Sequence, residues 1–204
     1  NEEAYLFQKL IRTGFGSNNV DHCTRLCHAS SVVALLEGIG SGAVSNPVMD
    51  VMKADVVIII GANPTVNHPV AATWIKNAAR NGTRLIVMDP RRSDLSRLAH
   101  RFVQFKPDTD VVFLNAMPHV IVHVGLATNE FIDSRTIGYE ELKTNVEGYS
   151  PELMAPICGV EAETIRYIAR LYATSKGSML LWGMGISQHV PGTDNARSLN
   201  ALPL

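Results

Sequence analysis

The chain has 204 residues, of which 46% are hydrophobic and 18% charged, and its formal net charge is −1. This composition is typical of a globular chain with enough apolar residues for one substantial core. Charges of both signs are mixed along the chain, which excludes a basic nucleic-acid-binding face and a polybasic membrane-binding segment. The longest apolar run, Val56–Ile60, is far too short to cross a bilayer. We therefore expect neither nucleic acid nor membrane as a partner.

The first fifty residues predict helices separated by glycine-rich turns. Residues 4–13 place Leu6, Leu10 and Ile11 on one helical face, and residues 31–37 have helical spacing as well. Glycines follow both stretches and are expected to end the helices.

The middle of the chain alternates between strand and helix patterns. Runs of β-branched and apolar residues predict buried parallel strands, and the stretches between them have helical spacing. In the helix expected at 69–80, Val70, Trp74 and Ala78 share a face. Pro118 is expected to bend the long helix at 110–124. The expected elements, in order, are strand 56–60, helix 69–80, strand 84–88, a short helix within 93–99, strand 101–105 and helix 110–124.

The last third adds helices and one more strand. From 129 to 159 the chain reads as short helices interrupted by glycines and prolines, and 161–174 as an amphipathic helix. A fourth strand is expected at 178–182. Strands and helices alternating in this way predict an α/β fold with a doubly wound, mostly parallel sheet and a helical appendage. Right-handed crossovers would bring the loops after 60 and 88 to one edge of that sheet.

Three loops at strand ends are candidate ligand sites, and each also has an ordinary structural interpretation. The loop 61–69 could hold a phosphate on its backbone N–H groups, or be a simple turn. Asp89 could accept hydrogen bonds from a ribose, or pair with a following arginine. Asp108–Asp110 could bind a ligand, or only cap the next helix. The glycines of 182–188 allow a ligand to approach the backbone, or simply make a turn.

The cysteines suggest metal or thiol chemistry. Cys23, Cys27 and Cys158 cannot all pair, which indicates reduced thiols. Cys23 and Cys27 could be ligands of a zinc ion, but no second pair of residues at zinc-site spacing follows them. A cysteine buried in the core is the ordinary alternative. In the adjacent Cys27 and His28, however, a thiolate that can bind a soft metal stands beside an imidazole that can move a proton.

Taken together, these segments resemble the molybdopterin oxidoreductase family, and in particular the catalytic subunits of formate dehydrogenases that couple to NAD. The resemblance extends over nearly the whole chain and keeps the order of the family's motifs. It is carried by the stretches DHCTRLCHASSV, GSGAVSN, IIIGANPTVNHP, VMDPRRSDLSRLAH, KPDTDVVFLNAM, IGYEELK, VEGYSPE and LLWGMGISQH.

The resemblance implies molybdenum (in some members tungsten) held by two molybdopterin guanine dinucleotides. Cys27 matches the protein ligand of the metal, and His28 matches the histidine of formate dehydrogenases; both are implied as catalytic. The glycine and proline that often follow that histidine are replaced here by Ala29 and Ser30. The implied cofactor-binding residues are Ile60, Gly61, Ala62, Asn63, Pro64, Thr65, Val66, Asn67, Asp89, Pro90, Arg91, Arg92, Ser93, Asp108, Thr109, Asp110, Met184 and Gln188.

The resemblance also implies a division of the chain and a larger protein around it. Residues 1–54 would be a helical segment with the metal-ligand cysteine loop, and 55–128 a Rossmann-like guanosine-binding core. Residues 129–177 would be a helical insertion, and 178–204 a returning strand with a pterin-contacting helix. A domain with a [4Fe-4S] cluster would precede residue 1, and the rest of the sheet, a barrel and a catalytic arginine would follow residue 204.

The implied activity is oxidation of formate to CO2, with electrons passing through iron–sulfur clusters to NAD on iron–sulfur and flavin-binding partner subunits. We expect a cytoplasmic protein, and we expect this piece to be inactive alone. Two alternatives remain open. One is another oxidoreductase of the same cofactor, such as a nitrate reductase. The other is a non-catalytic nucleotide-binding module, in which Cys27 would be a buried core residue.

Overall fold

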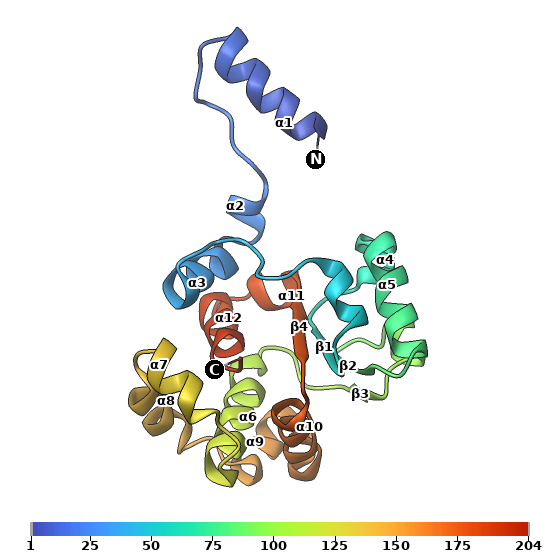
Figure 1. Cartoon of the computed structure of the whole chain (residues 1–204), viewed down its shortest axis with the longest axis vertical. Coiled ribbons are helices and arrows are strands. Elements are labelled where there is room, and N and C mark those ends of the chain that lie inside the picture. Colours follow the sequence, from blue (N-terminus) through green and yellow to red (C-terminus); the bar gives the residue numbers. More distant parts are fainter. Residues whose placement is uncertain (1, 204) are drawn as a thin grey trace.

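The computed structural model describes residues 2–203 and contains a four-stranded parallel sheet covered by helices on both faces (Figure 1). The strands are β1 (Val56–Ile60), β2 (Arg84–Met88), β3 (Arg101–Val103) and β4 (Ser178–Trp182). Their order across the sheet is β3-β2-β1-β4, so the chain winds outward from β1 in both directions. This confirms the predicted doubly wound α/β fold. The predicted division into four domains stays a prediction.

Successive apolar side chains along β1 enter two different cores, one on each face of the sheet. Val56, Ile58 and Ile60 enter one core with residues of β2, whereas Val57 and Ile59 enter the other. A strand buried on both faces has no polar positions, which explains the unbroken run of β-branched residues. β3 ends at Val103, two residues earlier than predicted.

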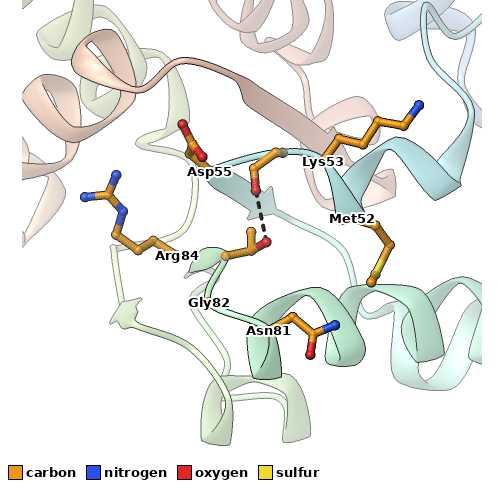
Figure 2. A pocket seen from close by; sticks show the side chains of 8 residues that line it. Met52, Lys53, Asp55, Asn81, Gly82 and Arg84 are labelled. Atoms are coloured by element: carbon orange, nitrogen blue, oxygen red, sulfur yellow. Dashed lines mark hydrogen bonds between the residues drawn. The ribbon is translucent and has the colours of Figure 1, made fainter.

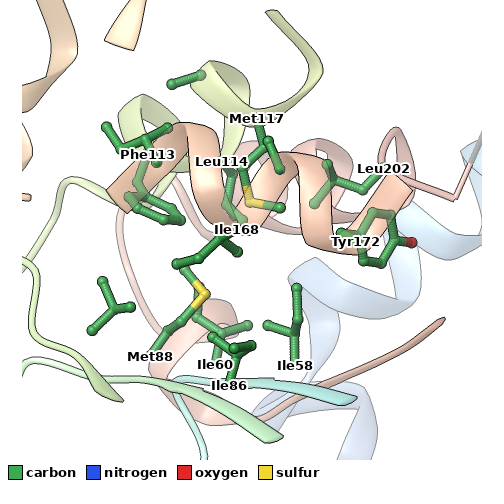
Figure 3. Packing of buried hydrophobic residues seen from close by; sticks show 14 of the residues in the cluster. Ile58, Ile60, Ile86, Met88, Phe113, Leu114, Met117, Ile168, Tyr172 and Leu202 are labelled. Atoms are coloured by element: carbon green, nitrogen blue, oxygen red, sulfur yellow. The ribbon is translucent and has the colours of Figure 1, made fainter. Parts of the chain in front are cut away.

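The larger core lies between the sheet and a group of helices, as Figure 3 shows for Ile58, Ile60, Met88 and Ile168. The helix α10 (Ala162–Thr174), which was predicted as amphipathic, buries Ile165, Ile168, Ala169 and Tyr172 there, and α6 (Asp110–Val124) runs unbroken through Pro118. Pro156, expected to interrupt a helix, lies inside α9. The helices associated with this half of the molecule are α3 (Ala29–Ile39), α6 (Asp110–Val124), α7 (Asn129–Arg135), α8 (Tyr139–Val146), α9 (Pro151–Cys158), α10 (Ala162–Thr174) and α12 (Gly192–Asn200).

The smaller core lies on the other face, under α5 (Pro69–Arg80), η2 (Val48–Met52) and η3 (Asp94–Arg97). The helix α5 has its predicted bounds, but its buried residues are Ala72, Ile75 and Ala78. Of the three residues predicted to share a face, Ala78 is buried and Trp74 packs against this core, whereas Val70 is 74% exposed. Small alanines allow the helix to approach the sheet closely, so they take the contact positions in preference to the larger valine.

The N-terminal helix α1 (Glu2–Lys9) continues into the π-helical turn η1 (Leu10–Gly14) and stands apart from the rest of the molecule (Figure 1). The predicted helix is present, but none of its described residues is buried, and the side chains of Leu6 and Leu10 are exposed. Within residues 2–203, no single helix has the length and apolar character needed to cross a membrane, although the sharply bent pair α6 and α7 meets those criteria together.

Candidate active site at the carboxyl edge of the sheet

The candidate residues are positioned by the carboxyl ends of the strands. Ile60 of β1 is in register with Met88 of β2 and with Trp182 of β4, so the loops that follow these strands leave the sheet at one edge. Topology therefore brings together segments that are more than a hundred residues apart in sequence, as parallel sheets do at their ligand-binding edge. The connecting helices at this edge are α2 (Thr24–Cys27), α4 (Pro64–Asn67) and α11 (Met184–Ser187).

Cys27 lies at the end of α2 and faces the segment that follows β4. Its Sγ is 2.8 Å from Met184 Sδ and 3.9 Å from Gln188 Nε2. Two predicted cofactor residues therefore contact the predicted metal ligand directly. Cys27 is half-buried. Loss of solvent is the main cause that raises the pKa of its thiol, and the neighbouring Cys23 raises it further. The protonated thiol can donate to the Met184 sulfur in this state.

His28 joins α2 to α3, and among the serines nearby only Ser187 contacts its ring. Its Nδ1 lies 3.3 Å from Ser187 Oγ, and Ser30 Oγ donates to the carbonyl of Ser187 at 2.5 Å. Ser31 Oγ, in turn, is 2.5 Å from Ser187 Oγ and accepts from Trp182 Nε1 at 2.9 Å. Sequence reasoning missed Ser31, Trp182 and Ser187. The helical spacing of His28 and Ser31 was the one available signal, because residues three apart share a helix face.

The loop after β1 is fixed by close backbone packing against the loop after β4. Gly61 has a φ of +57°, and its carbonyl accepts from the N–H of Gly185 at 2.9 Å. A Cβ on Gly185 would lie 2.7 Å from the Gly61 backbone, so both positions need glycine. Ile60 and Pro64 are buried, so their side chains are not accessible to a ligand. Ala62, Asn63 and Thr65 are partly exposed, with Thr65 donating to Asn63, whereas Val66 and Asn67 face solvent.

The remaining predicted residues form a carboxylate-rich region next to the same segment. Asp108 has a φ of +62°. One oxygen of its carboxylate lies 2.5 Å from His189 Nδ1 and accepts a hydrogen bond from it when that nitrogen carries a hydrogen. Asp110 is buried, and that burial raises its pKa to about 6, with His189, Asp108 and Asp89 as the nearby charges. The three predicted aspartates therefore lie close enough to interact. His189 was missed by the sequence reasoning, although it follows the predicted Gln188 directly.

Residues 89–93 border this region in different ways. Asp89 accepts from the N–H of Arg91 at 2.7 Å, and Arg92 stacks over Phe102 with 4.9 Å between its guanidinium carbon and the ring centre. Pro90 offers its carbonyl to Gln104, and Thr109 donates to the carbonyl of Lys106. The hydroxyl of Ser93 is buried without a hydrogen-bond partner among the described residues. A buried polar atom of this kind is normally satisfied by water or a ligand.

The three cysteines differ in burial. Cys23 is exposed, so the alternative of a cysteine buried in the core does not hold for it, whereas Cys158 of α9 is buried in the core. Within residues 2–203, no three or more His, Cys, Asp or Glu side chains gather into a group that could hold a metal ion unaided.

A hollow of about 280 Å³ lies at the opposite, amino-terminal edge of the sheet (Figure 2). It is lined by the residues that lead into β1 and β2, including Lys53, Asp55 and Arg84. None of the predicted site residues borders it. The hydrogen bond from the Thr83 hydroxyl to the Ala54 carbonyl, drawn in Figure 2, ties these two segments together and serves the fold.

Comparison with known proteins identifies relatives of this chain. The chain is 42% identical over 204 residues to formate dehydrogenase H of Escherichia coli, covering 100% of this chain and 28% of that protein. It is 42% identical over 198 residues to the alpha subunit of F420-dependent formate dehydrogenase 1 of Methanococcus maripaludis, covering 97% of this chain and 29% of that protein. It is also 37% identical over 202 residues to the periplasmic nitrate reductase of Desulfovibrio desulfuricans, covering 94% of this chain and 27% of that protein.

The fold is shared with a solved structure, acetylene hydratase from Pelobacter acetylenicus. The TM-score is 0.72 at 24% identity, covering 86% of this chain and 24% of that one. The chain thus spans less than a third of the length of each of these proteins. The model of the molybdopterin oxidoreductase family matches residues 1–204. The chain therefore belongs to the molybdopterin oxidoreductase family.

Proposed function

We propose that this chain is part of the catalytic subunit of a molybdenum-dependent formate dehydrogenase, with Cys27 as the metal ligand. The observation that carries the proposal is the packing of Cys27 Sγ against Met184 and Gln188, with His28 beside it. The proposed reaction converts formate to CO2, one proton and two electrons. We propose that the electrons pass through iron–sulfur clusters to NAD on partner subunits.

The residues at the carboxyl edge fit a pterin dinucleotide that holds a soft metal. A thiolate is a strong ligand for such a metal. The orphaned hydroxyl of Ser93 and the carboxylates of Asp89, Asp108 and Asp110 offer acceptors for the sugar and base of a guanosine. The chemistry that the bound metal supplies is two-electron redox, and the protein holds and tunes it.

The chain's own residues have distinct proposed roles in this reaction. Cys27 anchors the metal, and Gln188 donates toward its sulfur. His28 contacts formate, either as a hydrogen-bond donor that orients it or as the group that takes up the proton. Met184 packs against the same sulfur. The hydrogen bond from the Gly185 N–H holds the Gly61 loop, whose backbone is proposed to contact the cofactor.

The test uses the full-length enzyme with Cys27→Ala. A methyl group cannot ligate the metal, so formate oxidation should be abolished, as measured by steady-state turnover together with molybdenum content. His28→Ala should lower turnover by ~10²–10⁴-fold, as expected for loss of a positioned acid–base group, at nearly unchanged molybdenum content. Cys23→Ala is the matched control and should keep most of the activity, because Cys23 is exposed. Formate oxidation at the parent rate by Cys27→Ala would defeat the proposal.

A nitrate reductase is the second candidate, because a relative with that name matches 94% of the chain. His28 next to the proposed metal ligand favours formate. The metal-loaded full-length enzyme assayed with formate and with nitrate separates the two activities. The same preparation, assayed with NAD and with F420, tests the proposed electron acceptor, since one of the relatives named above is F420-dependent.

A further inference from the structure

A short chain of hydrogen bonds runs beneath His28 and connects three segments. It links Trp182 at the end of β4, Ser31 in α3 and Ser187 in α11. The two serines are 4% and 5% exposed, so water does not compete freely for their hydroxyl groups. The direction of each hydrogen bond can therefore be worked out from the donors and acceptors present.

The first two links have a single consistent direction. The indole Nε1 of Trp182 can only donate, so Ser31 Oγ accepts at 2.9 Å. The hydroxyl hydrogen of Ser31 then needs an acceptor, and Ser187 Oγ at 2.5 Å is the one that the described residues provide. The reverse direction would leave the Ser31 hydrogen buried without an acceptor, which is strongly unfavourable. Ser31 therefore donates to Ser187.

The hydroxyl hydrogen of Ser187 has two acceptors within reach. One is His28 Nδ1 at 3.3 Å, and the other is the carbonyl of Gly183 at 3.4 Å. The Gly183 carbonyl already accepts from the backbone N–H groups of Ile186 at 3.1 Å and Ser187 at 3.4 Å. Its two lone pairs are thus occupied, whereas Nδ1 has no other partner among the described residues. The Ser187 hydroxyl therefore donates to His28.

We propose that Ser187 is a positioning residue that fixes the neutral ring of His28 with its hydrogen on Nε2. Within the proposed function, on which this last step rests, His28 then presents an N–H group to an anionic carboxylate substrate. Of the two roles left open for His28, this selects hydrogen-bond donation to the substrate. Trp182 and Ser31 act through Ser187, because they set the direction of its hydrogen bond.

The primary test measures the tautomer of His28 by NMR of this chain with ¹⁵N-labelled histidine. The spectrum is recorded at about pH 8.5, roughly two units above the ordinary imidazole pKa of about 6.5. The His28 signals are identified among those of the seven histidines by their loss in His28→Gln. We expect a protonated Nε2 and an unprotonated Nδ1 whose resonance is displaced by an accepted hydrogen bond. A protonated Nδ1 in the parent chain would overturn the proposal.

Two variants that each remove one hydroxyl from the same cluster make the test specific. Ser187→Ala should abolish the hydrogen-bond displacement at Nδ1 and give a mixture of tautomers. Ser30→Ala is the matched control, since Ser30 donates to the Ser187 backbone and lies outside the chain of hydrogen bonds. Its His28 signals should match those of the parent. Unchanged Nδ1 signals in a folded Ser187→Ala variant would refute the role of Ser187.

A kinetic measurement separates this proposal from the proposed function. In the full-length enzyme, Ser187→Ala should lower kcat/KM for formate about 10-fold, as expected for loss of one hydrogen bond, while Ser30→Ala should not. If the NMR result holds but the parent enzyme does not oxidise formate, the proposed function fails and the positioning of His28 stands. If the parent oxidises formate and His28 carries its hydrogen on Nδ1, the positioning fails alone.

Discussion

Asp110 is a residue whose acid chemistry the fold alters strongly. It begins α6 and is 2% exposed, and burial raises its pKa from about 3.8 to about 6. The nearby His189 opposes that shift, whereas Asp108 and Asp89 add to it. Between these two values the unfolded chain releases the proton before the folded chain does. Stability therefore falls as pH rises through this window, and the loss is complete above about pH 6.

Asp110→Asn should remove this pH-dependent loss. The free energy of unfolding of the variant, relative to that of the parent, should rise by about 1–3 kcal/mol between pH 4 and pH 7, because Asn carries no charge to bury. Urea unfolding at both values checks this. The exposed Asp133, changed to Asn in the same way, is the control and should show no such gain. If the difference in free energy of unfolding between Asp110→Asn and the parent were the same at pH 4 and pH 7, the raised pKa of Asp110 would be contradicted.

The cysteines differ in burial and should react with thiol reagents in a fixed order. Cys23 is exposed, Cys27 is half-buried with a pKa raised by loss of solvent, and Cys158 is fully buried. Because the thiolate is the reactive form, labelling should be fastest at Cys23, slower at Cys27 and slowest at Cys158. Mass spectrometry of labelled peptides measures the three rates. If Cys27 were labelled as slowly as Cys158, that result would support the alternative in which Cys27 is a core residue.

At the scale of the elements, the sequence predicted what local patterns determine. The strands 56–60 and 178–182 and the helix 110–124 were predicted with correct bounds, because each contains an apolar run bounded by polar residues or glycine. In α5, Ala78 is buried and Trp74 packs against the smaller core, but Val70, which was predicted to share their face, is exposed, since spacing alone does not show how closely a helix approaches the sheet. The serines beneath His28 could not be predicted, because their partner Ser187 is more than 150 residues away in sequence.

The contact between the loops after β1 and β4 predicts a strict requirement for glycine. Gly185→Ala would place a methyl group 2.7 Å from the backbone of Gly61, and neither loop can yield without moving its strand. We expect a loss of about 1–3 kcal/mol in the free energy of unfolding, the range for overpacking. Gly148→Ala, whose added methyl group meets no atom within 4 Å, is the matched control and should change stability by less than about 0.5 kcal/mol.

At the scale of the whole molecule, the N-terminal arm is the segment with the least support. Its residues 2–16 contain no buried side chain, and the connection at 17–22 makes only local hydrogen bonds. Such a backbone opens at almost no cost in free energy. Limited digestion with a non-specific protease should therefore cut first within 15–22, and the product starting near residue 23 should resist further cleavage. First cleavage between β1 and β2 would contradict this description.

The pairing of β1 with β4 has a consequence for synthesis. Val56 lies opposite Ser178, which follows it by 122 residues. At the usual rate of about 5–20 residues per second, a ribosome needs roughly 6–24 seconds to pass from one to the other. Throughout that interval one edge of β1, made of Val56–Ile60, has no neighbouring strand to pair with. A nascent chain with such an edge is prone to aggregate, so a cell must shield it until the last strand has emerged.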